Sequence, residues 1–344
     1  MNIRNLHLGK AMRAALFVLL LTAGMTKSFA QTRVATLQHG DEITAFYGTN
    51  ALSQAHAAAE SGDVITLSSG TFNACDITKA ITLRGAGCYE DTLTGVQPTC
   101  ITNGNVHANI TEATTYFLTI EGIWFESSFY HNALNNPWFN KCDFAYFGHS
   151  GSGIMQNATF VNCRIRGYYY NTNSTNIFMI NSLLLSGVYN VSATCSLTLN
   201  NSIMVSYSNT SSDAAFVAYN SILINSSFGY GCSLYNCLTL NNSSVSLGNP
   251  FMVDCLNYSI SYGSTVFVGW ISPGNNGFID QSFELKQSFI NSFVGTDGTQ
   301  IGIYGGNVPY NKLPAYVRTQ VNVASQSTDD GMLNVEVEII DEDE

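Results

Sequence analysis

A short phrase recurs seven times between residues 139 and 255: an apolar residue, a variable one, a polar one and then a small one. The small residue returns at intervals of 21, 19, 20, 19, 16 and 18, at Cys142, Cys163, Ser182, Ser202, Ser221, Cys237 and Cys255. A period near 19 with short β-type segments is typical of a solenoid, in which each turn of chain buries its face on the next. The sequence therefore predicts an all-β fold, a parallel β-helix built as a single-stranded solenoid.

Counted from the small residue, positions −3 and +2 are mostly apolar, as a pleat of period two requires of a core. Position −3 holds Ile120, Phe139, Phe160, Met179, Leu199, Ala218, Leu234 and Met252, and position +2 holds Phe125, Phe144, Ile165, Leu184, Met204, Leu223, Thr239 and Asn257. Position −1 favours residues that tolerate a left-handed corner. These are Gly122, Asn162, Asn181, Asn201, Asn220 and Asn236, and we expect the stacked amides to hydrogen-bond along the axis.

The first thirty residues have the form of a secretory signal peptide. A basic start is followed by an apolar run from Ala14 to Met25 and by a small-x-small site ending at Ala30. Cleavage near Ala30 would place the protein in the periplasm, at the cell surface or outside the cell. No apolar run is long enough for a membrane span.

The remaining chain divides into three predicted parts. Residues 31–62 form an N-terminal segment with a capping helix from Asn50 to Ala59, in which His56 is a packed residue. Residues 63–280 form the parallel β-helix. Residues 281–344 form a C-terminal cap and covering segment with an acidic tail.

Two segments carry a resemblance to a known group. Gly62 to Leu67, followed by Ile81 to Gly87, resembles the opening of secreted bacterial right-handed parallel β-helix proteins of the pectin-lyase-like group. Thr296 to Gly306 resembles a closing segment of such proteins, especially Bacteroidetes-like ones. The resemblance implies a right-handed solenoid and an exported protein. The group's functions range from polysaccharide lyases and hydrolases to adhesins, so the fold alone assigns none of them.

Charge excludes several partners. The chain has 13 Lys+Arg and 24 Asp+Glu, a net charge of −11, and eight of the acids lie between Asp329 and Glu344. We therefore expect no nucleic-acid partner and no binding to an anionic membrane. Polyanionic sugars would need a bridging Ca²⁺. Between residues 127 and 260 the acids are Asp143, Asp213 and Asp254, too scattered to predict a Ca²⁺ site, so no cofactor or metal is predicted.

The catalytic residues that the resemblance would imply are not found. Asp329-Asp330 lies in the tail, and Gly148-His149-Ser150 is an incomplete match to a Gly-His-Gly motif. Glycoside hydrolysis needs two carboxyl groups at a fixed separation, and no pair of repeats supplies them. Catalytic residues are therefore left unassigned, and whether the protein is an enzyme is left open.

One charged cluster is a candidate contact site. Asp143 and Arg164 share position +1 on successive turns, and Arg166 lies at +3 beside them. One interpretation is a surface ion pair, worth about 0–1 kcal/mol. The other is a contact for an anion or for sugar hydroxyls, helped by Tyr168 to Tyr170 in an adjacent loop, with His149 as a solvated loop residue.

The later turns place aliphatic residues at the outward positions +1 and +3, namely Leu183, Leu185, Ile203, Val205, Ile222, Ile224, Leu238 and Leu240. An exposed stripe of this size has a cover or a partner. The alternating segment Met332 to Ile340 is one predicted cover, and a homo-oligomer is the other reading. Four cysteines occupy the small-residue slot as buried thiols, although disulfides Cys142–Cys163, Cys237–Cys255 and Cys88–Cys100 remain open.

The outward positions −4 and −2 carry aromatic and amide side chains, which suit neutral glycans because rings stack on sugar faces and amides bond hydroxyls. The leading hypothesis is therefore a non-catalytic protein that binds a glycan or a cell surface. A polysaccharide lyase or glycoside hydrolase of an unrecognised family is the first alternative, and a structural, self-assembling surface protein is the second. The candidate binding residues on this ridge are Trp138, Asn140, Phe178, Asn200, Tyr219, Tyr235 and Phe251.

Overall fold

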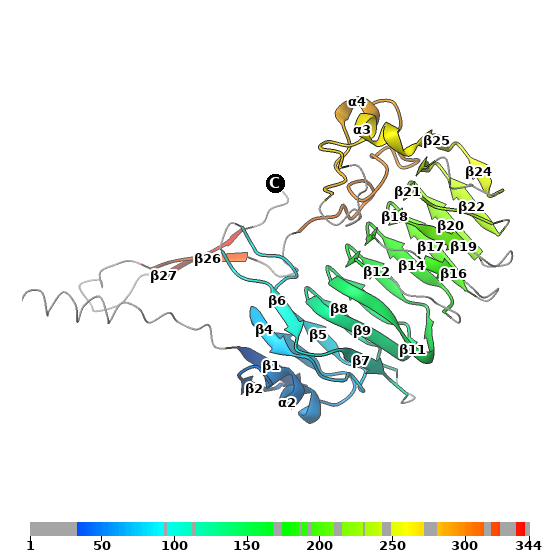
Figure 1. The fold of residues 1–344 in the computed structure, drawn as a ribbon. Helices are drawn as coiled ribbons and strands as arrows, with labels where there is room; N and C mark the ends of the chain where they lie inside the picture. Colours follow the sequence, from blue (N-terminus) through cyan, green and yellow to red (C-terminus); the bar gives the residue numbers. More distant parts are fainter. Residues whose placement is uncertain are drawn as a thin grey trace, which may run out of the picture. The chain divides into compact units, whose positions relative to one another are not determined.

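The computed structural model describes residues 33–92, 95–111, 115–167, 174–185, 188–190, 195–209, 215–229, 231–242, 249–271, 281–312, 318–323 and 335–340. The predicted signal peptide, residues 1–30, lies outside the described residues, and so do Tyr168 to Tyr170. The described chain is a parallel β-helix whose strands stack in chain order (Figure 1). The predicted fold class is thereby confirmed.

Two long sheets form the walls. Within the described residues, sheet 1 has twelve strands in the order β2 (Glu42–Tyr47), β1 (Val34–His39), β3 (Val64–Leu67), β5 (Thr82–Arg84), β8 (Thr119–Glu121), β10 (Trp138–Asn140), β12 (Thr159–Val161), β14 (Ile177–Ile180), β17 (Ser196–Asn200), β20 (Ala215–Tyr219), β22 (Cys232–Tyr235) and β24 (Phe251–Val253). Strands from β3 onward pair in parallel, whereas β1 pairs antiparallel with both β2 and β3.

In the same described part, sheet 2 runs β25 (Leu256–Ser259), β23 (Leu238–Asn241), β21 (Ile222–Ile224), β18 (Ile203–Val205), β15 (Leu183–Leu184), β13 (Arg164–Ile165), β11 (Asp143–Gln156), β9 (Trp124–Asn135), β6 (Thr99–Thr102) and β4 (Gly70–Asn73), with β7 (Val106–Asn109) also on β9. A parallel pair joins β16 (Val188–Asn190) to β19 (Tyr207–Asn209). An antiparallel pair joins β26 (Arg318–Val323) to β27 (Val335–Ile340).

The register matches the sequence pattern. On sheet 1, Phe139 pairs with Phe160 and Phe160 with Met179, and the −3 positions continue so to Met252. On sheet 2 the +2 positions pair in the same way from Phe125 to Asn257. The facing rings fill the interior between the sheets, where Phe139 and Phe160 stack with centroids 4.7 Å apart. Both inward rows are therefore confirmed as core positions except at the last turn, where Met252 is half-buried and Asn257 is exposed.

The corners between the sheets are left-handed, as predicted. Asn162, Asn181, Asn201 and Asn220 have φ between 46° and 51°, and Gly122 has φ 64°. Their amides only partly form the expected ladder, with Asn236 Nδ2 donating to Asn220 Oδ1 at 3.0 Å. Most of the other corner amides bond the C-terminal segment instead.

The N-terminal end is closed by helix α2 (Ala51–Ala58), on whose inner side Leu52 and His56 are buried. Asn50 precedes the helix, but its side chain makes no capping bond and accepts from Asn73 Nδ2 at 2.6 Å. Lys79 Nζ lies within 3.0 Å of three carbonyls near the helix end, which complements the negative end of the helix dipole. His56 accepts from the Thr78 N–H, as expected of a packed cap residue.

The outer aliphatic stripe on sheet 2 is covered by the chain's own C-terminal segment. The chain leaves the stack through a 3₁₀ turn η1 (Ile260–Tyr262) and two short helices, α3 (Gly263–Val266) and α4 (Gln287–Ile290). Side chains from this covering segment, defined as residues 260–271 and 281–310, bury all eight stripe residues to 8% exposure or less. A C-terminal cover was expected from residues 332–340, but residues 332–334 and the side chains of 335–340 lie outside the described residues. The contacts that described residues make with the stripe come from Val266, Phe267, Phe283, Leu285, Phe289, Ile301, Ile303 and Tyr310.

The stripe that the oligomer interpretation assigned to a second copy is thus buried within one chain. None of the nine cysteines, all of which lie in the described residues, forms a disulfide. Cys142, Cys163 and Cys237 are buried in the small-residue slot, as expected of packed thiols.

Candidate binding surfaces

The outward face of sheet 1 carries the predicted ridge. The register aligns position −4 as Trp138, Thr159 and Phe178 on successive strands, and position −2 as Asn200, Tyr219 and Tyr235. Trp138, Phe178, Tyr219 and Phe251 are between 42% and 58% exposed. From β10 to β24 the ridge crosses six strand spacings, about 29 Å at ~4.8 Å each. The structure thus brings the predicted ridge residues onto one continuous face.

The rings on this ridge are not all presented in the same way. Tyr219 and Tyr235 stack with centroids 5.0 Å apart and planes 11° apart, so each covers a face of the other and turns its edge and hydroxyl outward. Phe251 meets Tyr235 at 6.0 Å and 62°. Trp138 differs, because its neighbours in the row are Thr119 and Thr159. Phe178 also lies between threonines, Thr159 and Thr198, so the row neighbours of these two rings leave their faces unstacked on another ridge ring.

The Asp143 cluster is buried rather than a surface ion pair. Asp143 is 1% exposed and accepts from Arg166 Nε at 3.0 Å and Nη2 at 2.9 Å. Arg164 Nη1 lies 3.9 Å from Asp143 Oδ2, and Arg166 lies over the Trp124 ring at 5.6 Å. Removing one partner of such a buried pair costs about 3–5 kcal/mol because the other charge is left uncompensated. Loss of either Asp143 or Arg166 alone would therefore destabilise this part of the wall.

His149 also differs from expectation. It lies within β11 rather than in a loop, and both of its ring nitrogens are shielded from solvent. Its ring centroid is 6.3 Å from that of His131. The extension of β9 and β11 beyond the repeat length draws this histidine into the wall.

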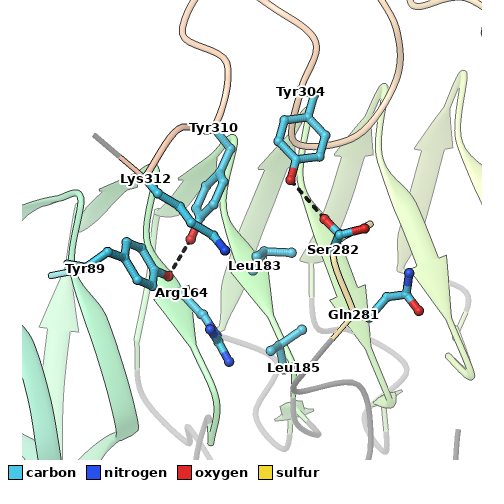
Figure 2. Close-up of a pocket in the computed structure, with 9 residues that line it drawn as sticks. All are labelled: Tyr89, Arg164, Leu183, Leu185, Gln281, Ser282, Tyr304, Tyr310 and Lys312. Atoms are coloured by element: carbon cyan, nitrogen blue, oxygen red, sulfur yellow. Dashed lines mark hydrogen bonds between the residues drawn. The ribbon is translucent and has the colours of Figure 1, made fainter. Parts of the chain in front are cut away.

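Arg164 faces a pocket between sheet 2 and the covering segment (Figure 2). The pocket has a volume of about 290 Å³. Its wall is formed by two leucines of the stripe, three tyrosines, two cations, an amide and a serine: Leu183, Leu185, Tyr89, Tyr304, Tyr310, Arg164, Lys312, Gln281 and Ser282. Within this wall the Tyr89 and Tyr310 hydroxyls lie 2.6 Å apart.

Burial governs the electrostatics of this pocket. It raises the pKa of the Tyr89 hydroxyl and of the Tyr310 hydroxyl, and neighbouring negative charge adds to both shifts. Burial acts to lower the pKa of Arg164, but Asp143 and Tyr89 outweigh it and raise that pKa. Both phenols therefore stay protonated and Arg164 stays charged at neutral pH.

Sequence reasoning identified Arg164 but missed the rest of the pocket. Tyr89 and Tyr310 are 221 residues apart in the chain, and Lys312 lies beyond the repeats. No periodic signal marks these residues, because they come from loops whose positions depend on how the covering segment lies.

Two further features of the described residues bear on function, their metal-binding side chains and their helices. Among the described residues there is no group of three or more His, Cys, Asp or Glu side chains placed to hold a metal ion. None of the helices in the described part of the chain has the length and apolar character needed to cross a lipid bilayer.

Comparison with protein-family models, with curated proteins and with solved structures found no match.

Proposed function

We propose that this protein is an exported, non-catalytic β-helix that binds a neutral glycan along the outward face of sheet 1. The observation that carries the proposal is the ridge itself, a flat row of exposed aromatic side chains interleaved with Thr and Asn over seven neighbouring strands. Export is supported by the form of residues 1–30 and by the resemblance to secreted proteins of the pectin-lyase-like group.

The chemistry of the ridge supports a sugar ligand with hydroxyls rather than a charged one. Trp138 offers an indole face for the apolar side of a pyranose ring. The hydroxyls of Tyr219 and Tyr235 and the amides of Asn140 and Asn200 both donate and accept hydrogen bonds. The nearest ion pair on this face joins Arg84 to Glu121 at 2.9 Å, so those two charges offset each other.

Binding to insoluble and soluble neutral polysaccharides tests the proposal. The mature protein and a Trp138→Ala/Tyr219→Ala/Tyr235→Ala variant are compared by pull-down and affinity electrophoresis. We expect the variant to lose binding on the order of tenfold or more, because stacked aromatic contacts contribute about 0.5–1.5 kcal/mol each beyond area burial.

Tyr47→Ala is the matched control, since Tyr47 is a 64% exposed tyrosine on β2 away from the ridge. Equal retention by the triple variant and the parent would overturn the proposed face. Release of reducing ends from any polymer in the same incubation, with Ca²⁺ present, would overturn the non-catalytic part and favour a lyase or hydrolase.

A further inference from the structure

The pocket beside Arg164 lies on the other side of the solenoid, and what is inferred from it does not depend on the proposed glycan face. The pocket of about 290 Å³ is at the small end of the range for ligand sites, so it suits a compact molecule. One side of it, in Figure 2, gathers Arg164, Lys312, Tyr89 and Tyr310, while Leu183 and Leu185 form an apolar wall.

The charged side of the pocket is positive although the chain as a whole is acidic. Arg166 binds Asp143 through two nitrogens, and Arg164 Nη1 lies 3.9 Å from the same carboxylate, so one negative charge stands against two guanidinium groups. Arg164 and Lys312 both line the pocket, and the described part of this lining contains no Asp or Glu. Glu284 lies within electrostatic reach of Tyr304, on the opposite side.

The tyrosine pair adds a hydrogen-bond donor. Two protonated phenols have two protons, and the bond between their oxygens, 2.6 Å apart, uses one of them, whichever hydroxyl is the donor. One phenol proton is therefore left for another acceptor. Lys312 Nζ lies 5.5 Å from the centroid of the Tyr89 ring, on the same side of the pocket.

We infer that this pocket binds a small monocarboxylate with an apolar body. The guanidinium fork of Arg164 matches the two oxygens of a carboxylate, and Lys312 supplies a point charge. The leucines and tyrosine rings contact the apolar part. A phosphate would share the charge preference but has no apolar body for Leu183 and Leu185 to contact.

Benzoate, its neutral isostere benzamide and inorganic phosphate are the probes, titrated into the mature protein by calorimetry and ligand-observed NMR. We expect benzoate to bind and benzamide to bind at least about tenfold more weakly, because a charged hydrogen bond contributes about 1.5–3 kcal/mol. Lys312→Gln should weaken benzoate to a similar extent. Lys312 is exposed, so this variant keeps the fold even where Arg164→Gln does not.

Arg84→Gln removes a cation from the opposite sheet and should leave benzoate binding unchanged. Equal binding of benzoate and benzamide, an unaffected Lys312→Gln, or no binding of any probe at millimolar concentration overturns the site. Tighter binding of phosphate than of benzoate, with the same response to Lys312→Gln, overturns the carboxylate assignment. Neither set of outcomes depends on whether the ridge binds glycan.

Discussion

The small-residue slot needs a hydrogen-bonding side chain as well as a small one. Ser202 Oγ accepts from the Ser182 N–H of the preceding turn at 3.1 Å and donates to the Asn200 carbonyl at 2.9 Å. Ser182 does the same for Cys163 and Ile180. The repeat alone indicated size, whereas the structure shows that the side chains of Ser182, Ser202, Ser221 and Cys255 each accept from the backbone N–H of the preceding turn.

Ser202→Ala should lower the free energy of unfolding by about 1–3 kcal/mol, because the Ser182 N–H loses its buried acceptor. Ser202→Cys should lose less, since Cys255 Sγ accepts from the Cys237 N–H at 3.4 Å in the equivalent slot. Urea denaturation of the three proteins measures both changes. Equal losses for Ala and Cys would show that only volume matters there.

His131 should make the fold sensitive to acid. Burial, with a smaller contribution from His149, lowers the pKa of His131 to about 3, while an unfolded histidine titrates at about 6.5. Below about pH 6.5 His131 therefore binds a proton in the unfolded state but stays neutral in the folded state. This histidine's contribution to stability is complete above that pH and falls by up to about 1.4 kcal/mol per pH unit down to about pH 3.

Comparison with His131→Phe isolates this effect, because all carboxylates titrate in both proteins. Unfolding free energies measured at pH 7, 5 and 4 should fall more steeply in the parent than in the variant. Parallel pH profiles would mean that His131 is protonated within the folded state.

At the scale of elements, the covering segment is held by the asparagine corners as well as by its apolar contacts. Asn181 Nδ2 donates to the Ile303 carbonyl at 2.8 Å and to the Gly305 carbonyl at 2.6 Å. Two glycines allow this close approach. A Cβ on Gly302, where φ is +76°, would lie 2.9 Å from Ile222, and one on Gly305 would collide with the Gln300 carbonyl oxygen and lie 2.9 Å from Asn201 Nδ2.

Asn181→Gly separates the tether from the backbone requirement, since glycine keeps the left-handed corner at φ 47° but has no amide. We expect a loss of about 1–3 kcal/mol because two buried carbonyls lose a donor. We also expect faster hydrogen exchange in residues 300–306.

Asn176→Gly is the matched control. Asn176 has φ 56° and is exposed, and its side chain bonds neighbouring turns of the stack, donating to Asn157 Oδ1 and accepting from Ser196 Oγ. It should change stability less and leave exchange in the covering segment unaltered. If Asn176→Gly lowered the free energy of unfolding more than Asn181→Gly did, the covering segment would be held by its apolar contacts alone.

The sequence predicted the stack better than the cover for a physical reason. Strand pairing repeats the same contacts every turn, so Phe139, Phe160 and Met179 reveal a shared row by spacing alone. The covering segment makes each contact once, through turns, and the spacing of Phe283, Phe289 and Ile303 follows no period. The strict alternation of apolar and polar residues instead led to the prediction that residues 332–340 form the cover. The pocket was missed for the same reason, because Tyr89 and Lys312 meet Arg164 only once the cover is in place.

At the scale of the whole molecule, the outward faces of the two sheets differ in character. Sheet 1 leaves aromatic and hydroxyl side chains in solvent, whereas the aliphatic face of sheet 2 is buried beneath the covering segment. A stacked β-helix has no globular interior in which to hide such a face. We therefore expect the cover to keep this aliphatic face away from other copies of the chain.

Ile303→Asp tests this role of the cover. Ile303 is 1% exposed within the stripe contacts, so the variant places a carboxylate in an apolar cluster, and its desolvation should lift the covering segment from the stripe. The exposed stripe should then associate with other copies, seen by light scattering as mass that grows with protein concentration. Val308→Asp puts the same charge on a 44% exposed position of the same segment and should behave as the parent. If Ile303→Asp stays at the parent's mass at every concentration, then burial of the stripe is not what keeps copies of this chain apart.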